Sequence, residues 1–235
     1  MSNIQQDPGS FRDPLSRVFV GADTVVRAFT EQGKADIDAV WSKKSIARAL
    51  ASGDLIESNI VEPASVGLGA PWAGAMTHPK VPFISYPYEW TFSMLKDAAL
   101  LQLRLTRETL ADGIGLKDAT PYNVQFIGSR PQFIDAGSFE KRKKSDPWYG
   151  YRQFCEMFLY PLMLQGYLGV GFQPFLRGAV NGISPDTMRK LLPASIRRPR
   201  KGRLTHVVLH AAAQNRFADS NVEMKKEAAK AGMSA

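Results

Sequence analysis

The sequence predicts an α+β fold with two lobes, a small β-rich lobe over residues 15–87 and a larger, mainly helical lobe over residues 88–218. Short β-prone runs are concentrated near the N-terminus, whereas helical spacing of apolar residues dominates the later part of the chain. Hydrophobic residues fill 44% of the 235 positions, which is enough for a substantial core. Residues 1–14 are expected to form a disordered leader and residues 219–235 a charged tail. An α/β, Rossmann-like fold is the alternative.

The small lobe is expected to begin with a β-hairpin. Arg17–Val20 and Thr24–Phe29 are β-prone runs, and the turn between them contains glycine and aspartate. Apolar residues then recur at helical spacing from Lys34 to Ser52, which predicts one amphipathic helix that ends before a glycine. Residues 62–80 are rich in Pro, Gly and Ala and are interpreted as a connection. Val81–Tyr86 is interpreted as a strand that leads to a hinge.

The larger lobe is expected to begin with a long helix over residues 91–111, with a threonine as its N-cap and glycines after its end. Two short strands, 123–127 and 132–134, surround a Gly-Ser-Arg-Pro turn and predict a second hairpin. Helical patterns then return over residues 148–168 and 205–229. The order of elements is therefore hairpin, helix, strand, helix, hairpin and further helices.

One constellation carries recognisable chemistry. Asp118 and Asn123 form a D-x-x-x-x-N motif, and Asp135 follows twelve residues after the asparagine in an apolar-D-x-G sequence. This pairing resembles the catalytic loop and the metal-binding strand of protein-kinase-like phosphotransferases. The resemblance implies that Asp118 accepts or orients the proton of a substrate hydroxyl, while Asn123 and Asp135 hold the Mg²⁺ of Mg-ATP. A loop followed by a hairpin would bring all three side chains to one ion.

Three further residues are candidates for binding a nucleotide cofactor. Arg27 occupies the place most similar to the lysine of V-A-I-K, and Lys117 directly precedes Asp118, so either is expected near phosphate. Glu89, beside Trp90 at the predicted hinge, is a candidate ligand anchor. The chain departs from the kinase pattern, because Leu116 and Lys117 precede Asp118 where kinases usually have His and Arg, or His and Gly. No G-x-G-x-x-G lies in the first hairpin, and a guanidinium is not equivalent to that ammonium.

Several longer stretches carry a second resemblance, namely residues 85–90, 93–100, 116–126 and 150–161. Over residues 15–218 the chain is similar to the N-terminal region of larger bacterial class I S-adenosylmethionine-dependent methyltransferase-type proteins, among them rhizobial proteins of host-specific nodulation. The resemblance implies a pathway that modifies a small molecule or a signal. It also implies that S-adenosylmethionine acts through a methyltransferase partner.

Three functions are compatible with these patterns. The first is a kinase-like nucleotide-binding module, active or degenerate, with a small-molecule substrate. The second is a non-catalytic scaffold that partners a methyltransferase. The third is the methyltransferase itself, because an apolar strand ending in Asp-x-Gly at residues 133–137 resembles the start of a loop that binds S-adenosylmethionine. Further glycines, which such loops usually contain, do not follow Gly137.

The charge distribution and the cysteine content limit which binding partners and which cellular compartment we expect. The formal net charge is +8, but nine basic residues lie in the two runs 141–144 and 197–203. Such local patches argue against a protein that coats nucleic acid and leave membrane-surface contact open. The single cysteine, Cys155, cannot form an intramolecular disulfide, which favours a cytoplasmic location. Residues 157–176 carry no charge, but their prolines and glycines favour a buried helix over a transmembrane span.

Overall fold

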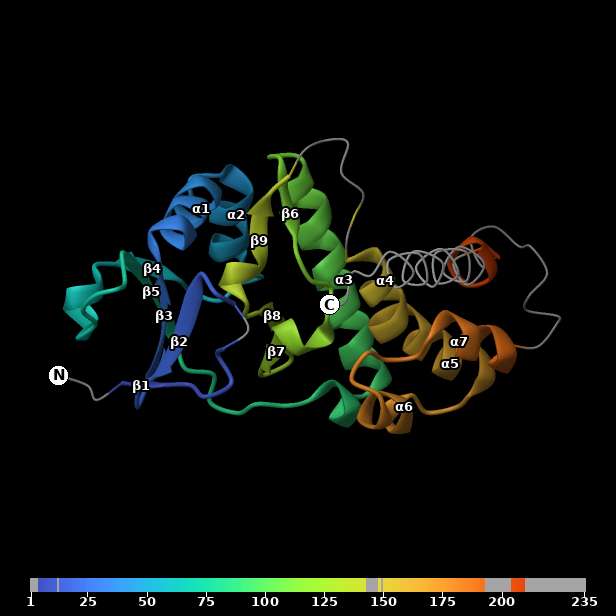
Figure 1. Cartoon of the computed structure of the whole chain (residues 1–235). Coiled ribbons are helices and arrows are strands. Elements are labelled where there is room, and N and C mark those ends of the chain that lie inside the picture. The colour runs from blue at the N-terminus through green and yellow to red at the C-terminus, as the bar shows by residue number, and fades with distance from the viewer. Residues whose placement is uncertain (1–3, 12, 143–147, 149, 193–203, 210–235) are drawn as a thin grey trace, which may run out of the picture. The chain divides into compact units, whose positions relative to one another are not determined.

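A computed structural model describes residues 4–11, 13–142, 148, 150–192 and 204–209 (Figure 1). It contains antiparallel sheets together with several helices, which confirms the predicted α+β class. The chain divides into two compact units after Phe154. The sequence instead places a lobe boundary near residue 87, and that boundary stays a prediction.

The first unit begins with a five-stranded antiparallel sheet in the order β1-β2-β3-β5-β4. The predicted hairpin is confirmed as β2 and β3, which pair from Ser16–Phe29 to Val20–Val25. One strand precedes it, because Gln5 and Gln6 pair with Val20 and Phe19, so this part of the predicted disordered leader is ordered. The strands are β1 (Gln5–Gln6), β2 (Ser16–Val20), β3 (Thr24–Phe29), β4 (Asn59–Val61) and β5 (Gly74–Pro79).

The prediction for residues 62–86 was wrong in two places. Strand β5 lies inside the segment interpreted as a connection, and it pairs with both β3 and β4. Its Gly, Ala and Pro content hides it in the sequence, because those residues are depleted in strands. No strand forms over 81–86, where Pro82 removes a backbone donor and residues 82–84 are exposed.

The single helix predicted over Lys34–Ser52 is two helices, α1 (Glu31–Trp41) and α2 (Lys44–Ser52). Thr30 caps α1, since its hydroxyl accepts the Gly33 N–H. The helices separate because Lys43 takes an extended conformation, with φ −89° and ψ 144°. The helical spacing of apolar residues continues from α1 into α2, and for this reason periodicity alone did not reveal the break between them.

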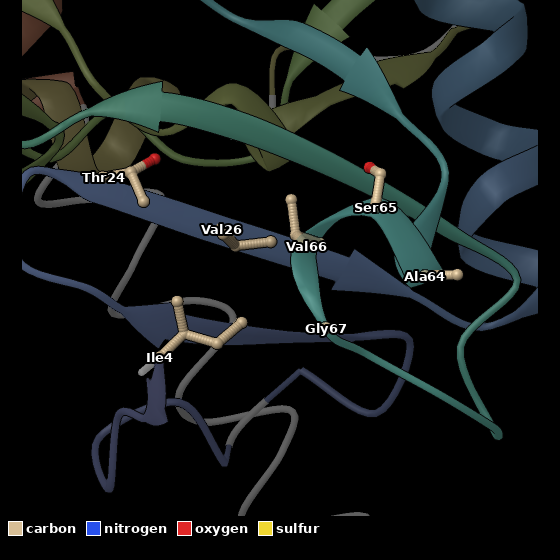
Figure 2. A pocket seen from close by; sticks show the side chains of 7 residues that line it. All are labelled: Ile4, Thr24, Val26, Ala64, Ser65, Val66 and Gly67. Carbon is tan, nitrogen blue, oxygen red and sulfur yellow. The ribbon is translucent and has the colours of Figure 1, made fainter. Parts of the chain in front are cut away.

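The two faces of the sheet pack differently. On one face, Val26 and Ala28 of β3 join Phe19 and Ala75 in a core cluster covered by Trp72 and its neighbours. A hollow of about 190 Å³ remains on this side, between Ile4, β3 and the 3₁₀ turn of residues 63–66 (Figure 2). On the opposite face, Phe29 of β3 and Met76 of β5 pack with Ile37 of α1 and with Ala136, which follows the later hairpin.

The rest of the first unit is one long helix followed by short strands. The predicted helix is confirmed as α3 (Phe92–Leu110), with Thr91 as N-cap to the Met94 N–H. The predicted second hairpin is confirmed as β7 (Val124–Ile127) and β8 (Arg130–Phe133). Strand β6 (Ile114–Leu116) pairs with β9 (Phe139–Lys141), and α4 (Tyr151–Phe154) ends the unit.

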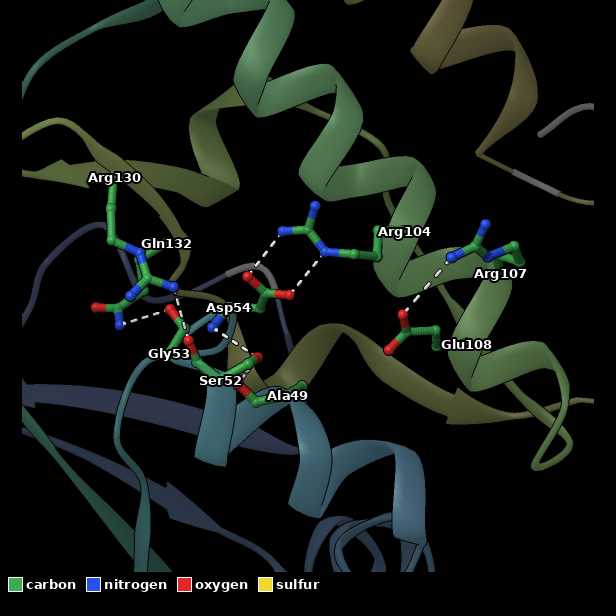
Figure 3. Close-up of polar contacts among 9 residues, drawn as sticks. All are labelled: Ala49, Ser52, Gly53, Asp54, Arg104, Arg107, Glu108, Arg130 and Gln132. Atoms are coloured by element: carbon green, nitrogen blue, oxygen red, sulfur yellow. Dashed lines mark hydrogen bonds and ion pairs between the residues drawn. The ribbon is translucent and has the colours of Figure 1, made fainter.

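Polar contacts connect the end of α2 to α3 and to the hairpin of β7 and β8 (Figure 3). Arg104 of α3 donates two hydrogen bonds to the Asp54 carboxylate, at 2.8 and 2.7 Å. Leu55 forms a parallel bridge with Phe133 of β8, and the Phe133 N–H donates to the Asp54 carbonyl. The β8 side chains of Arg130 and Gln132 donate to carbonyls at the end of α2. The end of α2, α3 and the hairpin are therefore held together.

The second unit is helical where it is described. It contains a π-helical turn (Cys155–Leu159), α5 (Tyr160–Leu168), α6 (Gln173–Gly178), α7 (Pro185–Leu191) and a second π-helical turn (Leu204–Leu209). The helix predicted over 148–168 is thus present from Tyr151, and most of the one predicted over 205–229 lies outside the described residues, as does the predicted tail. Among the described residues, no helix is both long and apolar enough to cross a membrane.

Candidate functional site

A cavity of about 360 Å³ opens beside the sheet, on the face opposite the Val26 cluster. Its apolar wall is formed by Val18, Val20 and Val25 of β2 and β3, with Ile84 and Ile134. Alternation along the strands explains this lining, because Val25 and Arg27 share a face while Val26 points to the other side. The volume falls within the range of small-molecule sites. The β-branched residues thus build a mainly apolar chamber.

Arg27, which lines this cavity, forms an ion pair with Asp135. Arg27, which lines the cavity from the third strand of the sheet, donates from Nη2 to Asp135 Oδ1 at 2.7 Å. The two side chains are only 18% and 26% exposed. Arg27 Nε is buried with no hydrogen-bond partner. The guanidinium therefore keeps donor capacity for an anionic group.

The glycine of the D-x-G sequence makes room for this arginine. A Cβ at Gly137 would lie 2.9 Å from Arg27 Nη1, closer than two such atoms pack. A glycine here allows the guanidinium to lie against the backbone beyond Asp135. The motif thus has a steric reason that does not depend on any metal.

Asp118 lies in the loop after β6, and its side chain is exposed. Gln102 of α3 holds the loop, because its Nε2 donates to the Asp118 carbonyl at 3.1 Å. Partial desolvation raises the pKa of the Asp118 carboxyl, and the negative charge of Asp135 raises it further. The negative charge of Asp135 therefore acts on the Asp118 carboxyl. A raised pKa also makes Asp118 a better proton acceptor.

Asn123 connects the loop to Asp135 through the backbone. Its carbonyl accepts the Ile134 N–H at 2.8 Å, and its side-chain Nδ2 is buried without a partner. Within the described residues, no group of three or more His, Cys, Asp or Glu side chains could hold a metal ion. Mg²⁺ needs fewer, since it is commonly bound by one or two carboxylates together with phosphate oxygens. Asn123 and Asp135 thus fit Mg²⁺ only as part of a complex with a phosphate ligand.

The other two predicted cofactor-binding residues have structural contacts. Lys117 donates from Nζ to the Gly137 carbonyl at 3.3 Å, and its own N–H donates to the Ser138 carbonyl. Glu89 is exposed and accepts the Tyr86 N–H at 2.8 Å, which closes the turn before α3. Of the three predicted residues, Arg27 alone lines the cavity. Ligand binding by Lys117 and Glu89 stays a prediction.

A second loop, which precedes the predicted hairpin, also reaches the cavity. Because β1 precedes β2, the first hairpin loop spans residues 7–15, and it contains one glycine, Gly9. Asp7 holds this loop through its carboxylate, which accepts the Gly9 N–H at 2.8 Å, and it also lines the cavity. The loop is therefore short of glycine and brings an acidic residue to the cavity wall.

Sequence reasoning missed His78, which lines the cavity from β5 and is 7% exposed. Its Nδ1 lies 3.0 Å from Ser58 Oγ and 3.3 Å from the Glu57 carbonyl. Burial lowers the pKa of His78 to about 4, and the nearby positive charge of Arg27 contributes. No motif marks this residue, and only its position on the hidden strand β5 would have revealed it.

Comparison with known proteins gives one clear relative, while no protein-family model matches the chain. The chain is 39% identical over 185 residues to Nodulation protein NoeA of Rhizobium meliloti (strain 1021). The similarity covers 78% of this chain and 38% of the relative, so the chain spans about two fifths of that protein's length. The predicted relationship to a rhizobial nodulation protein is confirmed. The methyltransferase and kinase relationships stay predictions.

Proposed function

We propose that this chain is a kinase-like module that binds a nucleotide in the cavity beside its N-terminal sheet. The proposal rests on one observation, the contact of Asp135 with Arg27, and Arg27 lines the cavity. It brings a cation from the third strand to the carboxylate of the D-x-G sequence, 108 positions later. Protein kinases likewise place a lysine on their third strand and an aspartate in a D-x-G sequence around the nucleotide phosphates.

The two ends of the site suit the two ends of a nucleotide. The apolar wall of Val18, Val20 and Ile134 suits a flat base, which gains by leaving water. Arg27 suits a phosphate, because its guanidinium has donors that Asp135 does not use. A nucleotide thus satisfies both the apolar and the cationic part of the cavity.

Asn123 and Asp135 would hold Mg²⁺ once phosphate is present, and the ion would neutralise charge on the phosphate oxygens. Asp118, with its raised pKa, would take the proton of an acceptor hydroxyl. The sequence resemblance implies an acceptor in the modification of a small molecule or signal in host-specific nodulation, and the similar protein is named as a nodulation protein.

A second candidate is a non-catalytic module that supports a methyltransferase using S-adenosylmethionine. Two observations favour it. The chain covers 38% of its longer relative, and the loop over residues 7–15 has one glycine where a phosphate-covering loop would have several. In this alternative, the cavity serves the fold or a partner and not phosphotransfer.

Thermal unfolding tests these alternatives. The midpoint is measured without ligand, with Mg-ATP and with S-adenosylmethionine, because a ligand that binds only the native state must raise it. Mg-ATP at about 100 times its dissociation constant would stabilise the protein by about 2.7 kcal/mol, equivalent to about 5 to 10 °C at this size. Asp135→Asn should abolish the shift. The control is Asp38→Asn, which breaks the exposed ion pair with Lys34 in the same unit.

Each outcome separates the candidates. A Mg-ATP shift that persists in Asp38→Asn and disappears in Asp135→Asn supports the nucleotide site. A shift with S-adenosylmethionine alone replaces the proposal with a methyltransferase function. No shift with either ligand favours the non-catalytic module.

A further inference from the structure

We infer that His78 selects the ligand of the cavity, because its Nε2 accepts a hydrogen bond and thus favours an amino-bearing base of the adenine type over the same base with a carbonyl. This inference rests on the proposed nucleotide site and assigns its base preference. It depends on which ring nitrogen of His78 carries the proton.

The partners of Nδ1 fix that proton. The Glu57 carbonyl near Nδ1 can only accept a hydrogen bond. The Ser58 hydroxyl donates its single hydrogen to the Ile56 carbonyl at 2.8 Å, so toward His78 it also acts as an acceptor. Both neighbours of Nδ1 are therefore acceptors, and Nδ1 must carry the hydrogen. In the neutral ring, Nε2 is then an unprotonated acceptor.

Nε2 is available to a ligand. No hydrogen bond joins it to any residue in the part of the chain that the structure describes, whereas Nδ1 has two partners. The contacts with Glu57 and Ser58 hold the Nδ1 edge of the ring, and His78 is one of the residues that line the cavity. A ring held on one side presents its acceptor with little conformational freedom.

The electrostatic surroundings keep the ring neutral. Burial and the positive charge of Arg27 on β3 lower the pKa of His78 to about 4, while the Glu57 carbonyl and the Asp135 carboxylate act in the opposite direction. At neutral pH, Nε2 therefore stays an acceptor. A carbonyl placed against it would leave two acceptors facing each other, which costs the hydrogen bond and the solvation of both groups.

The cavity wall contains one other acceptor that must be distinguished from His78. Asp7 lines the same cavity, and its Oδ1 accepts the Gly9 N–H. Its charge would favour any donor, including those of a ribose, whereas the imidazole is neutral and held by the strand. If His78 selects the base, the preference is lost in a His78 variant. If Asp7 selects it, the preference is lost in an Asp7 variant.

Isothermal titration calorimetry of the full chain with Mg-ATP and Mg-ITP tests the inference, because these nucleotides differ at the position where adenine has its amino group. The wild type should bind ATP about tenfold more tightly, the value of one hydrogen bond of about 1.4 kcal/mol. His78→Asn keeps a polar group near Ser58 and Glu57 but is too short to replace Nε2, so the preference should fall to about onefold. His78→Gln, which extends an amide to that position, should restore part of it.

Asp38→Asn, which breaks an exposed ion pair outside the cavity, is the control and should leave the preference unchanged. Equal affinity of the wild type for both nucleotides, or an unchanged preference in His78→Asn, would overturn the inference while leaving the nucleotide site intact. Loss of preference in Asp7→Asn instead would assign selection to that residue. A wild type that binds neither nucleotide refutes the proposed function itself, and the inference with it.

Discussion

Acidification should destabilise the first unit through His78, because its neutral form is buried. The folded pKa is about 4 and the ordinary value is 6.5, so protonation is easier in the unfolded chain. Because the folded pKa of His78 is lowered, its contribution to folding stability is fully present above pH 6.5. It is lost as the pH falls from about 6.5 toward about 4.

The difference between the folded and the ordinary pKa of His78 sets how much folding stability is lost on acidification. Each unit of difference corresponds to about 1.4 kcal/mol, so the complete loss approaches about 3 kcal/mol below pH 4. Between about pH 7.5 and about pH 5, linkage gives a loss of about 2 kcal/mol. Asp118 acts in the opposite direction, since its raised pKa favours the folded state as the pH falls.

Urea unfolding of the wild type and of His78→Gln at both pH values isolates this effect. The variant lacks the titrating group, so Asp118 and the other carboxyls cancel in the difference between the two proteins. We expect that difference to change by about 2 kcal/mol in favour of the variant on acidification. A difference that stays constant over this range would show that His78 is not buried in its neutral form, and the reasoning on its Nε2 would fail.

Three substitutions test the packing, each by urea unfolding. Gly182→Ala should cost more than about 2 kcal/mol, because φ is +78° and a Cβ would collide with the backbone carbonyl of Glu156. Thr91→Ala should cost about 1 kcal/mol through loss of the cap on α3, and Thr91→Ser should cost little. Asp54→Asn should cost about 1 kcal/mol, because it weakens a paired contact with Arg104 that is partly exposed; no change would mean that the pair contributes nothing.

The elements that could be predicted are those whose signal is local. The hairpin of β2 and β3 combines β-prone runs with a short turn, and α3 combines apolar spacing with Thr91 as a cap. Strand β5 could not be predicted in this way. Its Gly74 is favoured by packing, because a Cβ there would lie 3.0 Å from Lys34 Cγ, and this contact comes from a distant part of the chain.

In the candidate site too, residues with a local sequence signal could be predicted, and residues that depend on distant contacts could not. Asp118, Asn123 and Asp135 lie within eighteen positions on a loop and a hairpin, so their spacing predicts that they approach one another. His78 depends on the pairing of β5 with β3 and on contacts with residues twenty positions earlier. A lone histidine in a segment rich in glycine and proline gives no sign of such contacts.

The 108 positions between Arg27 and Asp135 have a consequence for the order in which this protein folds. The hairpin of β7 and β8 closes over a two-residue turn, and α3 is local, so both can form early at small entropic cost. The ion pair must instead close a loop of more than a hundred residues, after the sheet has joined the hairpin. Cavity and charge pair therefore arise together as a late event. During refolding, the contact between Arg27 and Asp135 should therefore form after α3, and it marks the completed assembly of the first unit.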